Sequence, residues 1–569
     1  MTEAMPALNI IFMIITTLLS VAAVFSFYVR DIVEAKTGKP LKIPRDNNEI
    51  DPIIYRIMLI MIIVIGVLIR VWQFGSVPGG MNQDGAMAAV DGKALADYGT
   101  DRFGTWHPAH LYAWGYGQMS SLLSYLIAPF VKIFGLNPIT ARMPSLLMSL
   151  LGGMFLYLFV KDHFGKRTAL CAALIVALNP WHFVQSRWAL DCNLLPHFFM
   201  GGVYFFGKGL SGKKRWLYIS MVFFGLCMYC YGITIYTIPV FLLVTSVYYL
   251  IRKKVKVRHV LICALIYLVI AAPFILTMAV NYFKWETIKL PFVTCQFFPE
   301  SRRSSDILFF SNNIGWQLGQ NLQYFLNATI LQVKDAPHND IEHFYTMYPF
   351  MIPLFFAGIL SFPKIKSKGN KSLAVFALLT GVWVGIVTNF VNVNRMNIIY
   401  YFMMLFAALG MYVIAREIRF AGYAVALLIA VAGVILINTY FTTYNKDISA
   451  RFYAGFGDAV KVVTQSPADT LYISADIQGK GYWTVSEIMT MFYDETDAAY
   501  YQGKTNVNHG QTYLPYKERF KYESITQETV TKSADQNAAY LVLKSDLPYF
   551  DLSRYNVAEF GNYCAVTKK

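Results

Sequence analysis

Charged and aromatic residues gather in a few short stretches of a chain that is otherwise strongly apolar. The candidates for chemistry are Asp84 and Lys93 in 82–99, Trp106 and His107 in 104–117, Arg187 and Asp191 in 179–198, Arg395 in 391–397, and Arg142. Taking such side chains out of water is costly, so their presence beside long apolar segments makes them candidates for function.

Asp84 and Asp191 are the acidic candidates, and each also has a simpler interpretation. Asp84 precedes a stretch with helical character, where an aspartate satisfies free backbone N–H groups of the first turn. Asp191 and Arg187 have the (i, i+4) spacing at which two side chains can pair on a helix. The residues alone leave the functional and the structural interpretations open.

Three arginines are candidates for binding an anion. Arg187 and Arg395 are each the lone cation of a short loop, and Arg142 lies at the start of an apolar segment. A guanidinium can bind a phosphate through two parallel hydrogen bonds, which suits a lipid phosphate at a membrane face. Ordinary contact with lipid headgroups is the alternative for each of them.

Two further stretches are compatible with ligand binding without indicating it. Trp106 and His107 belong to an aromatic cluster that can anchor the chain at a membrane interface, although aromatic rings also stack on the faces of sugars. Residues 335–344 contain two histidines and several carboxylates, but their spacing matches no defined metal site.

The composition places all of these residues in a membrane protein. Of the 569 residues, 56% are hydrophobic and 15% are charged, against roughly 45–50% and about 25% in soluble proteins. The formal net charge of +15 is compatible with a nucleic-acid partner, but the excess cations lie in short loops between apolar segments, so we exclude nucleic acid. The seven cysteines show no disulfide framework.

Apolar segments long enough to cross a bilayer recur along the chain. We predict about 12 transmembrane helices, at 8–29, 53–73, 143–160, 168–185, 193–207, 216–232, 234–251, 259–280, 345–362, 372–391, 398–415 and 420–441. Nearly half of the 49 Lys and Arg residues lie in alternate short loops, which predicts that these loops are cytoplasmic.

The same alternation predicts that the apolar residues 118–134 do not cross the membrane, because a crossing there would invert every later basic loop. We therefore expect a large extracytoplasmic loop at 74–142 and a second one at 281–344. Residues 1–52 form an extra helix and a cytoplasmic loop, and 53–441 form the membrane domain. Residues 442–569 have a near-neutral charge balance and alternate strand and helix patterns, which predicts a small extracytoplasmic α/β domain.

Several of these residues together resemble the glycosyltransferases of the C-type fold. Asp84 stands at the position of their first-loop acid, and His107-Pro108 matches a mannosyltransferase motif. Ala141–Ser145 matches the opening of the next helix, and Phe183–Arg187 with Asp191 matches a further motif. Within residues 53–210 the sequence is most similar to the protein O-mannosyltransferases and lipid A aminoarabinose transferases, a group like glycosyltransferase family 39. Many relatives have Asp-Glu at the first-loop site, whereas Gly85 follows Asp84 in this chain.

The resemblance implies an enzyme that moves a sugar from a polyprenyl-phosphate donor to an extracytoplasmic acceptor of the cell envelope. Asp84 would be the general base, and Asp191 would either orient Arg187 or help Asp84 hold a divalent metal ion. Arg187, Arg395 and Lys93 would bind the donor phosphate. His107, Trp106 and Arg142 would contact substrate. No cofactor other than that metal is implied.

Two other functions remain compatible with the sequence. A transporter or flippase of lipid-linked sugars would place similar residues in a membrane, although such proteins tend to have paired halves, which are not evident here. A non-catalytic membrane scaffold for envelope polymer is the third possibility.

Overall fold

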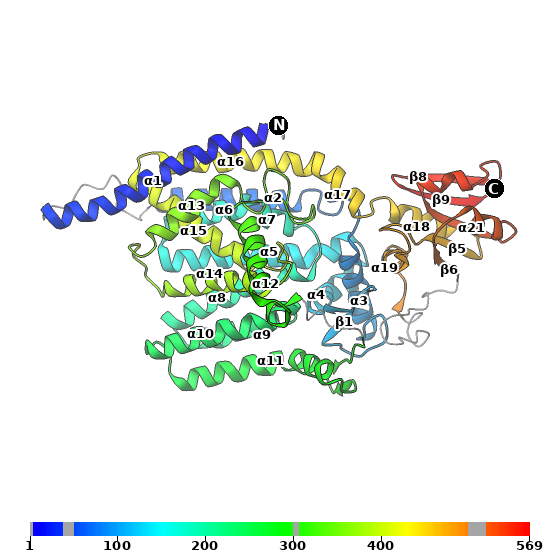
Figure 1. The fold of residues 1–569 in the computed structure, drawn as a ribbon, viewed down its shortest axis with the longest axis horizontal. Coiled ribbons are helices and arrows are strands. Elements are labelled where there is room, and N and C mark those ends of the chain that lie inside the picture. The colour runs from blue at the N-terminus through cyan, green and yellow to red at the C-terminus, as the bar shows by residue number, and fades with distance from the viewer. Residues whose placement is uncertain (1–3, 38–49, 116, 300–305, 499–518) are drawn as a thin grey trace.

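Long helices run side by side along one axis of the molecule, and a smaller domain with a β-sheet lies at one end of them (Figure 1). The computed structural model describes residues 4–37, 50–115, 117–299, 306–498 and 519–569. Helix α15 is buried along almost its whole length, so it forms the centre of the bundle.

Helices make up most of the chain before residue 440, and strands are concentrated after it. The elements of the bundle and its loops are, in chain order, α1 (Met5–Thr37), α2 (Pro52–Val71), α3 (Gln83–Tyr98), β1 (His110–Tyr112), β2 (Gln118–Ser120), α4 (Leu122–Phe134), α5 (Pro138–Phe164), α6 (Lys166–Leu178), α7 (Pro180–Gln185), η2 (Asp191–Leu194), α8 (Leu195–Ser211), α9 (Arg215–Cys227), η3 (Gly232–Tyr236), α10 (Ile238–Ile251), α11 (Val257–Phe283), β3 (Ile288–Leu290), β4 (Val293–Cys295), η5 (Leu308–Phe310), α12 (Ile314–Thr329), η6 (Pro349–Met351), α13 (Ile352–Ser361), α14 (Ser372–Val387), α15 (Ile399–Glu417) and α16 (Ala421–Thr439). Those that follow are η7 (Tyr440–Tyr444), α17 (Asn445–Arg451), α18 (Phe456–Gln465), β5 (Thr470–Ser474), α19 (Trp483–Tyr493), β6 (Phe520–Glu523), α21 (Gln527–Lys532), β7 (Ala538–Leu543), η8 (Lys544–Tyr549), β8 (Tyr555–Phe560) and β9 (Tyr563–Lys568).

The predicted class, a helical polytopic membrane protein, is confirmed, but the count of about 12 crossings is not. Among the described residues, 7 helices are long and apolar enough to span a membrane, and four shorter apolar helices accompany them. One reason is visible at the predicted segment 168–185, which is split into α6 and α7. Asn179 leaves the helical conformation there, and its side chain accepts a hydrogen bond from His182 N at 2.9 Å, which starts a new helix at Pro180.

The basic loops meet at one end of the bundle. Lys368 N donates to His163 O at 2.9 Å, and Lys214 Nζ donates to Lys254 O at 3.3 Å. Helix α4, which covers the predicted non-crossing segment, lies instead beside α3 and β1, toward the end that carries the C-terminal domain (Figure 1).

The C-terminal domain contains a five-stranded mixed sheet with the order β6-β5-β7-β9-β8. Strand β5 is parallel to both β6 and β7, whereas β9 is antiparallel to β7 and β8. Strands and helices alternate in this part of the chain, as its sequence pattern predicts, with α18 before β5 and α21 before β7. The expectation of a small α/β fold is therefore confirmed for this part of the chain.

The segment between α2 and α3 is fastened to the chain that leads into this domain. Met81 N donates to Phe452 O at 2.7 Å, and Gly79 N donates to Asn445 Oδ1 at 3.0 Å. Gly80 has φ of 75° and a Cβ there would lie 2.0 Å from Phe452 O, so only glycine fits. The chain between α16 and the C-terminal domain therefore holds the segment just before α3, where Asp84 lies.

Candidate active site

A cavity of about 1300 Å³ lies between the end of the helix bundle and the C-terminal domain. One wall is apolar and comes from η3 and α11, including Ile233, Phe274 and Met278. The other wall is polar and comes from the β1–β2 hairpin, Asp191, Arg395 and residues 481–484. A cavity with one apolar side and a few convergent polar groups is the usual form of a ligand site.

Asp191 lies at the polar side of this cavity, and Asp84 is close to it. Asp84 is in the first turn of α3 and accepts a hydrogen bond from Trp114 Nε1 at 2.5 Å. The N-cap residue of α3 is Asn82, so the interpretation of Asp84 as the cap is wrong. Asp191 begins η2, is 6% exposed, and accepts from Cys192 N at 2.7 Å.

The negative charge of Asp84 affects the pKa of Asp191. Burial raises the pKa of Asp191 to about 7, and the negative charge of nearby Asp84 contributes to this rise, while hydrogen bonds from Cys192 and Ser120 oppose it. A carboxyl group with a pKa near neutrality can exchange a proton under the conditions in which an enzyme works. The pair is therefore suited to acid–base chemistry.

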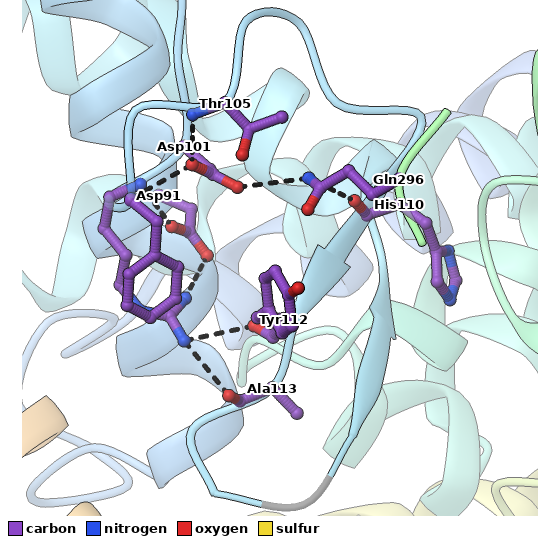
Figure 2. A network of polar contacts seen from close by, with 9 residues as sticks. Asp91, Asp101, Thr105, His110, Tyr112, Ala113 and Gln296 are labelled. Atoms are coloured by element: carbon purple, nitrogen blue, oxygen red, sulfur yellow. Dashed lines mark hydrogen bonds and ion pairs between the residues drawn. The ribbon is translucent and has the colours of Figure 1, made fainter. Parts of the chain in front are cut away.

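The hairpin that forms the polar wall is held by a network of buried charges (Figure 2). Arg102 forms an ion pair with Asp91 at 2.6 Å and donates to the carbonyls of Tyr112 and Ala113, both at 3.1 Å. Asp101 accepts from the amides of Phe103 and Thr105. Arg102 therefore holds the end of β1, and Gln296 Nε2, which donates to Asp101 at 3.3 Å and to His110 O at 3.4 Å, holds its start.

His110 is the residue of this hairpin that faces the cavity with an imidazole ring. Gln296 Nε2 donates a hydrogen bond to the backbone carbonyl of His110 at 3.4 Å, and the imidazole ring of His110 points away from the network (Figure 2). Burial lowers the pKa of His110 to about 4, so the ring is neutral at pH 7. Its Nδ1 has no hydrogen-bond partner among the described residues, which leaves a neutral polar atom at the wall.

Arg395 is the cation of the cavity. Its guanidinium forms an ion pair with Asp306 at 2.7 Å and donates to the carbonyl of Asn389 at 2.6 Å. The side chain of Arg395 is 16% exposed, and it is accessible from the cavity that it lines. This position suits the predicted contact with a donor phosphate.

Arg187 lies elsewhere, and its position favours a structural role over the predicted phosphate contact. Its guanidinium donates to five carbonyls at the end of α2 and just beyond it, at 2.6–3.3 Å, namely those of Ile69, Arg70, Trp72, Gln73 and Val77. Aromatic rings surround it, including those of Phe183, Tyr440 and Phe441. The expected pairing with Asp191 is not among its contacts, because the last turn of α2 binds this side chain instead.

Arg142 and Lys93 are also engaged away from the cavity. Arg142 donates to the carbonyls of Phe74 and Gly80, at 3.3 and 2.5 Å, and so supports the segment that precedes Asp84. Lys93 pairs with Asp97 at 2.8 Å on the outer side of α3. Neither residue lines the cavity, and the predicted contacts of Arg142 with substrate and of Lys93 with phosphate remain predictions.

The aromatic cluster at 104–117 does belong to the site, but through different members from those chosen on sequence. Trp106 and His107 pack edge to face near the end of α3, with ring centroids 4.2 Å apart, and neither is a lining residue. Trp114 and His110 are the members that reach Asp84 and the cavity. Residues 481–484 were missed, although glycines followed by Tyr482-Trp483 were a signal for an ordered aromatic turn.

The acidic pair does not by itself form a metal cage. Among the described residues there is no group of three or more His, Cys, Asp or Glu side chains that could hold a metal ion. Each carboxylate already accepts a hydrogen bond, from Trp114 for Asp84 and from Cys192 for Asp191. We therefore derive no step through a metal, either at this pair or at the acidic stretch 335–344.

Comparison with known proteins places this site in a wider group. Residues 120–276 match the family model described as dolichyl-phosphate-mannose-protein mannosyltransferase. The fold is similar to that of ArnT from Cupriavidus metallidurans without ligand, with a TM-score of 0.54, 13% identity, and 90% of this chain and 97% of that chain covered. ArnT bound to undecaprenyl phosphate gives 0.52 with the same identity and coverage. No curated protein matches the sequence.

The fold is similar to that of the C-type membrane glycosyltransferases. Within that class the matched segment and the ArnT-like fold confirm the resemblance to the protein mannosyltransferase and ArnT group. The predicted kind of enzyme agrees with the family model over residues 120–276 and with the fold.

The titration of Asp191 is directly testable. Infrared difference spectra of its carboxyl stretch should give a midpoint near pH 7 in the wild type, because burial and the charge of Asp84 oppose ionisation. In Asp84→Asn the neighbouring charge is gone, so the midpoint should move to lower pH. Asp97→Asn changes a charge on the same helix that pairs with Lys93 and Lys132, and it should leave the midpoint unchanged. An Asp191 midpoint near pH 4 in the wild type would contradict the electrostatic coupling.

Proposed function

We propose that this protein transfers a sugar from a polyprenyl-phosphate donor to an acceptor hydroxyl, in the cavity beneath its C-terminal domain. The observation that carries this proposal is the pairing of Asp84 with Asp191 beside a cavity whose far wall is apolar and whose cation is Arg395. ArnT, which has a similar fold, has been solved bound to undecaprenyl phosphate, and this supports a donor of this class.

Each part of such a donor meets a matching surface. The polyprenyl chain would lie along the apolar wall of η3 and α11, because α11 is also a candidate membrane helix and is open to lipid. The phosphate would bind Arg395, whose guanidinium can exchange Asp306 for a phosphate oxygen while it keeps the bond to Asn389. The sugar would then face the two carboxylates.

The chemical step follows from this arrangement. The acceptor oxygen attacks the anomeric carbon, its proton passes to Asp84, and the bond from that carbon to the phosphate oxygen breaks. The polyprenyl phosphate leaves with the bonding electrons, and Arg395 stabilises the charge that develops on it. Asp191, with its pKa of about 7, keeps a shared proton available beside Asp84 and holds the acceptor hydroxyl through a hydrogen bond.

Asp84→Asn tests the role of the base. Asparagine preserves the shape of the side chain but cannot take a proton, so transfer should fall by at least about 10²-fold, the low end for general-base catalysis. Turnover of a polyprenyl-phosphate sugar by purified protein measures this effect.

Asp97→Asn is the matched control, because Asp97 lies on the same helix, is partly exposed, and pairs with the surface lysines Lys93 and Lys132. It should retain wild-type turnover. Turnover of Asp84→Asn close to the wild-type rate would remove Asp84 from the mechanism.

Arg395→Met tests the phosphate contact. Hydrogen bonds to charged groups contribute about 1.5–3 kcal/mol, so the Kd for undecaprenyl phosphate should rise by roughly 10- to 100-fold. Asp306→Asn should instead strengthen binding, since it removes the carboxylate that competes for the guanidinium. Arg554→Met, at an exposed ion pair of the C-terminal domain, should have no effect. Unchanged affinity in Arg395→Met would place the phosphate elsewhere.

We further propose that the C-terminal domain and the cavity are extracytoplasmic, since the basic loops gather at the opposite end of the bundle. Single cysteines at Lys461 and Lys213, both exposed positions, form a matched pair for labelling with an impermeant maleimide. Lys461→Cys should react in intact cells, and Lys213→Cys only after lysis. The native cysteines give little background, because all except the half-buried Cys171 are buried. The reverse pattern would invert the proposed orientation.

A further inference from the structure

Part of the wall of the cavity belongs to the C-terminal domain and not to the membrane bundle. Gly481 and Tyr482, which precede α19, and Trp483 and Thr484, which begin it, line the same cavity as Asp191. The proposed reaction assigns the apolar wall to the polyprenyl chain and Arg395 to the phosphate, so this segment has no role in binding the donor. It faces the space that remains for the second substrate.

The segment is held firmly in place. The carboxylate of Asp476 accepts from Gly481 N at 2.7 Å and from Ser524 Oγ at 2.9 Å, which closes the turn before α19. Thr484 packs against Gly115 of the hairpin, where an added Cβ would lie 2.4 Å from Thr484 Oγ1. The turn and the hairpin are therefore in contact, and the aromatic residues between them have a defined position at the cavity.

The side chains that the segment itself presents are uncharged and are aromatic or carry a hydroxyl group. Tyr482 is 55% exposed and stands next to Trp483, and Thr484, Gln118 and Ser120 add uncharged polar groups. Among the described residues that line the cavity, the charged side chains are Asp191, Asp306 and Arg395, and the last two pair with each other. Asp84, close to Asp191, adds a further negative charge.

We propose that Tyr482, Trp483 and Thr484 form the acceptor subsite and that the acceptor is an uncharged glycan. This inference rests on the proposed function and adds the class of acceptor to it. An aromatic ring packs on the C–H face of a sugar ring, and neighbouring hydroxyl and amide groups bind the hydroxyls around its edge.

The charges at this end of the cavity argue against other acceptors. A phosphorylated glycolipid would bring negative charge next to Asp84 and Asp191, and like charges repel. A peptide in extended form gains affinity from backbone pairing with an exposed strand edge, and no strand of the C-terminal sheet is among the lining residues of the described chain. A neutral glycan needs neither cations nor a strand edge.

The test uses the purified full chain with a radiolabelled polyprenyl-phosphate sugar. Donor hydrolysis, with water as the acceptor, is measured first because it reports the proposed function alone. The same reaction is then supplied separately with the neutral polysaccharide, anionic polymer, lipid and protein fractions of the envelope of the source cells. Label should enter the neutral polysaccharide fraction.

Two variants connect that result to the segment. Trp483→Ala and Tyr482→Ala should raise the KM for the neutral fraction about 10-fold or more, as expected for the loss of a stacked ring, and leave donor hydrolysis unchanged. Tyr482→Phe keeps the ring and should retain most acceptor affinity. Tyr549→Ala, an exposed tyrosine of the same domain outside the cavity, is the control and should match the wild type.

The outcomes separate the two proposals. Absence of donor hydrolysis by the wild type overturns the proposed function. Hydrolysis with label in the anionic, lipid or protein fraction, or in no fraction, overturns the glycan acceptor and leaves the donor chemistry standing. An unchanged KM in both alanine variants overturns the subsite even when the neutral fraction is labelled.

Discussion

The guanidinium of Arg187 holds together the part of the molecule on which the site depends. Helix α2 ends at Val71 and leaves carbonyls without partners inside the helix, and Arg187 binds those of Ile69, Arg70 and Trp72. The same side chain reaches Val77 at 2.7 Å, so it also shapes the chain that leaves the helix. In an environment of low dielectric, unsatisfied carbonyls and an unpaired cation would each be costly, and in this arrangement each satisfies the other.

This contact fixes the path of the chain to Asp84. Arg142 binds the carbonyl of Gly80, and the link to the C-terminal domain binds Met81, so the segment is held on both sides before α3 begins. Asp84 then enters the first turn of α3, where the partial positive charge of the helix N-terminus favours a carboxylate. Buried arginines that bind backbone carbonyls therefore determine where the proposed base stands.

The sequence predicted the class of fold well because hydropathy and loop charge act over long segments. It also identified Asp84, Asp191 and Arg395, which the structure places at or beside one cavity. It placed Arg187 at the donor phosphate because a lone arginine in a short loop has no visible partner, and backbone carbonyls carry no signal in a sequence. Trp114 and His110 lie in the aromatic stretch that was recognised, but which ring turns inward depends on the Asp91–Arg102 pair and on Gln296, far away in the chain. The contribution of residues 481–484 depends on how two domains pack, which no local pattern encodes.

The wall formed by Tyr482 and Trp483 has a consequence for which part of the chain selects the acceptor. The membrane bundle and the C-terminal domain each contribute residues to a single cavity, and they meet where Thr484 of α19 contacts Gly115 of the hairpin. In the proposed arrangement, a substitution in the loop before α19 changes the contacts with the acceptor and leaves Arg395 and the apolar wall, which bind the donor, unchanged. In the proposed arrangement, the residues that select the acceptor therefore belong to a different part of the chain from those that bind the lipid carrier.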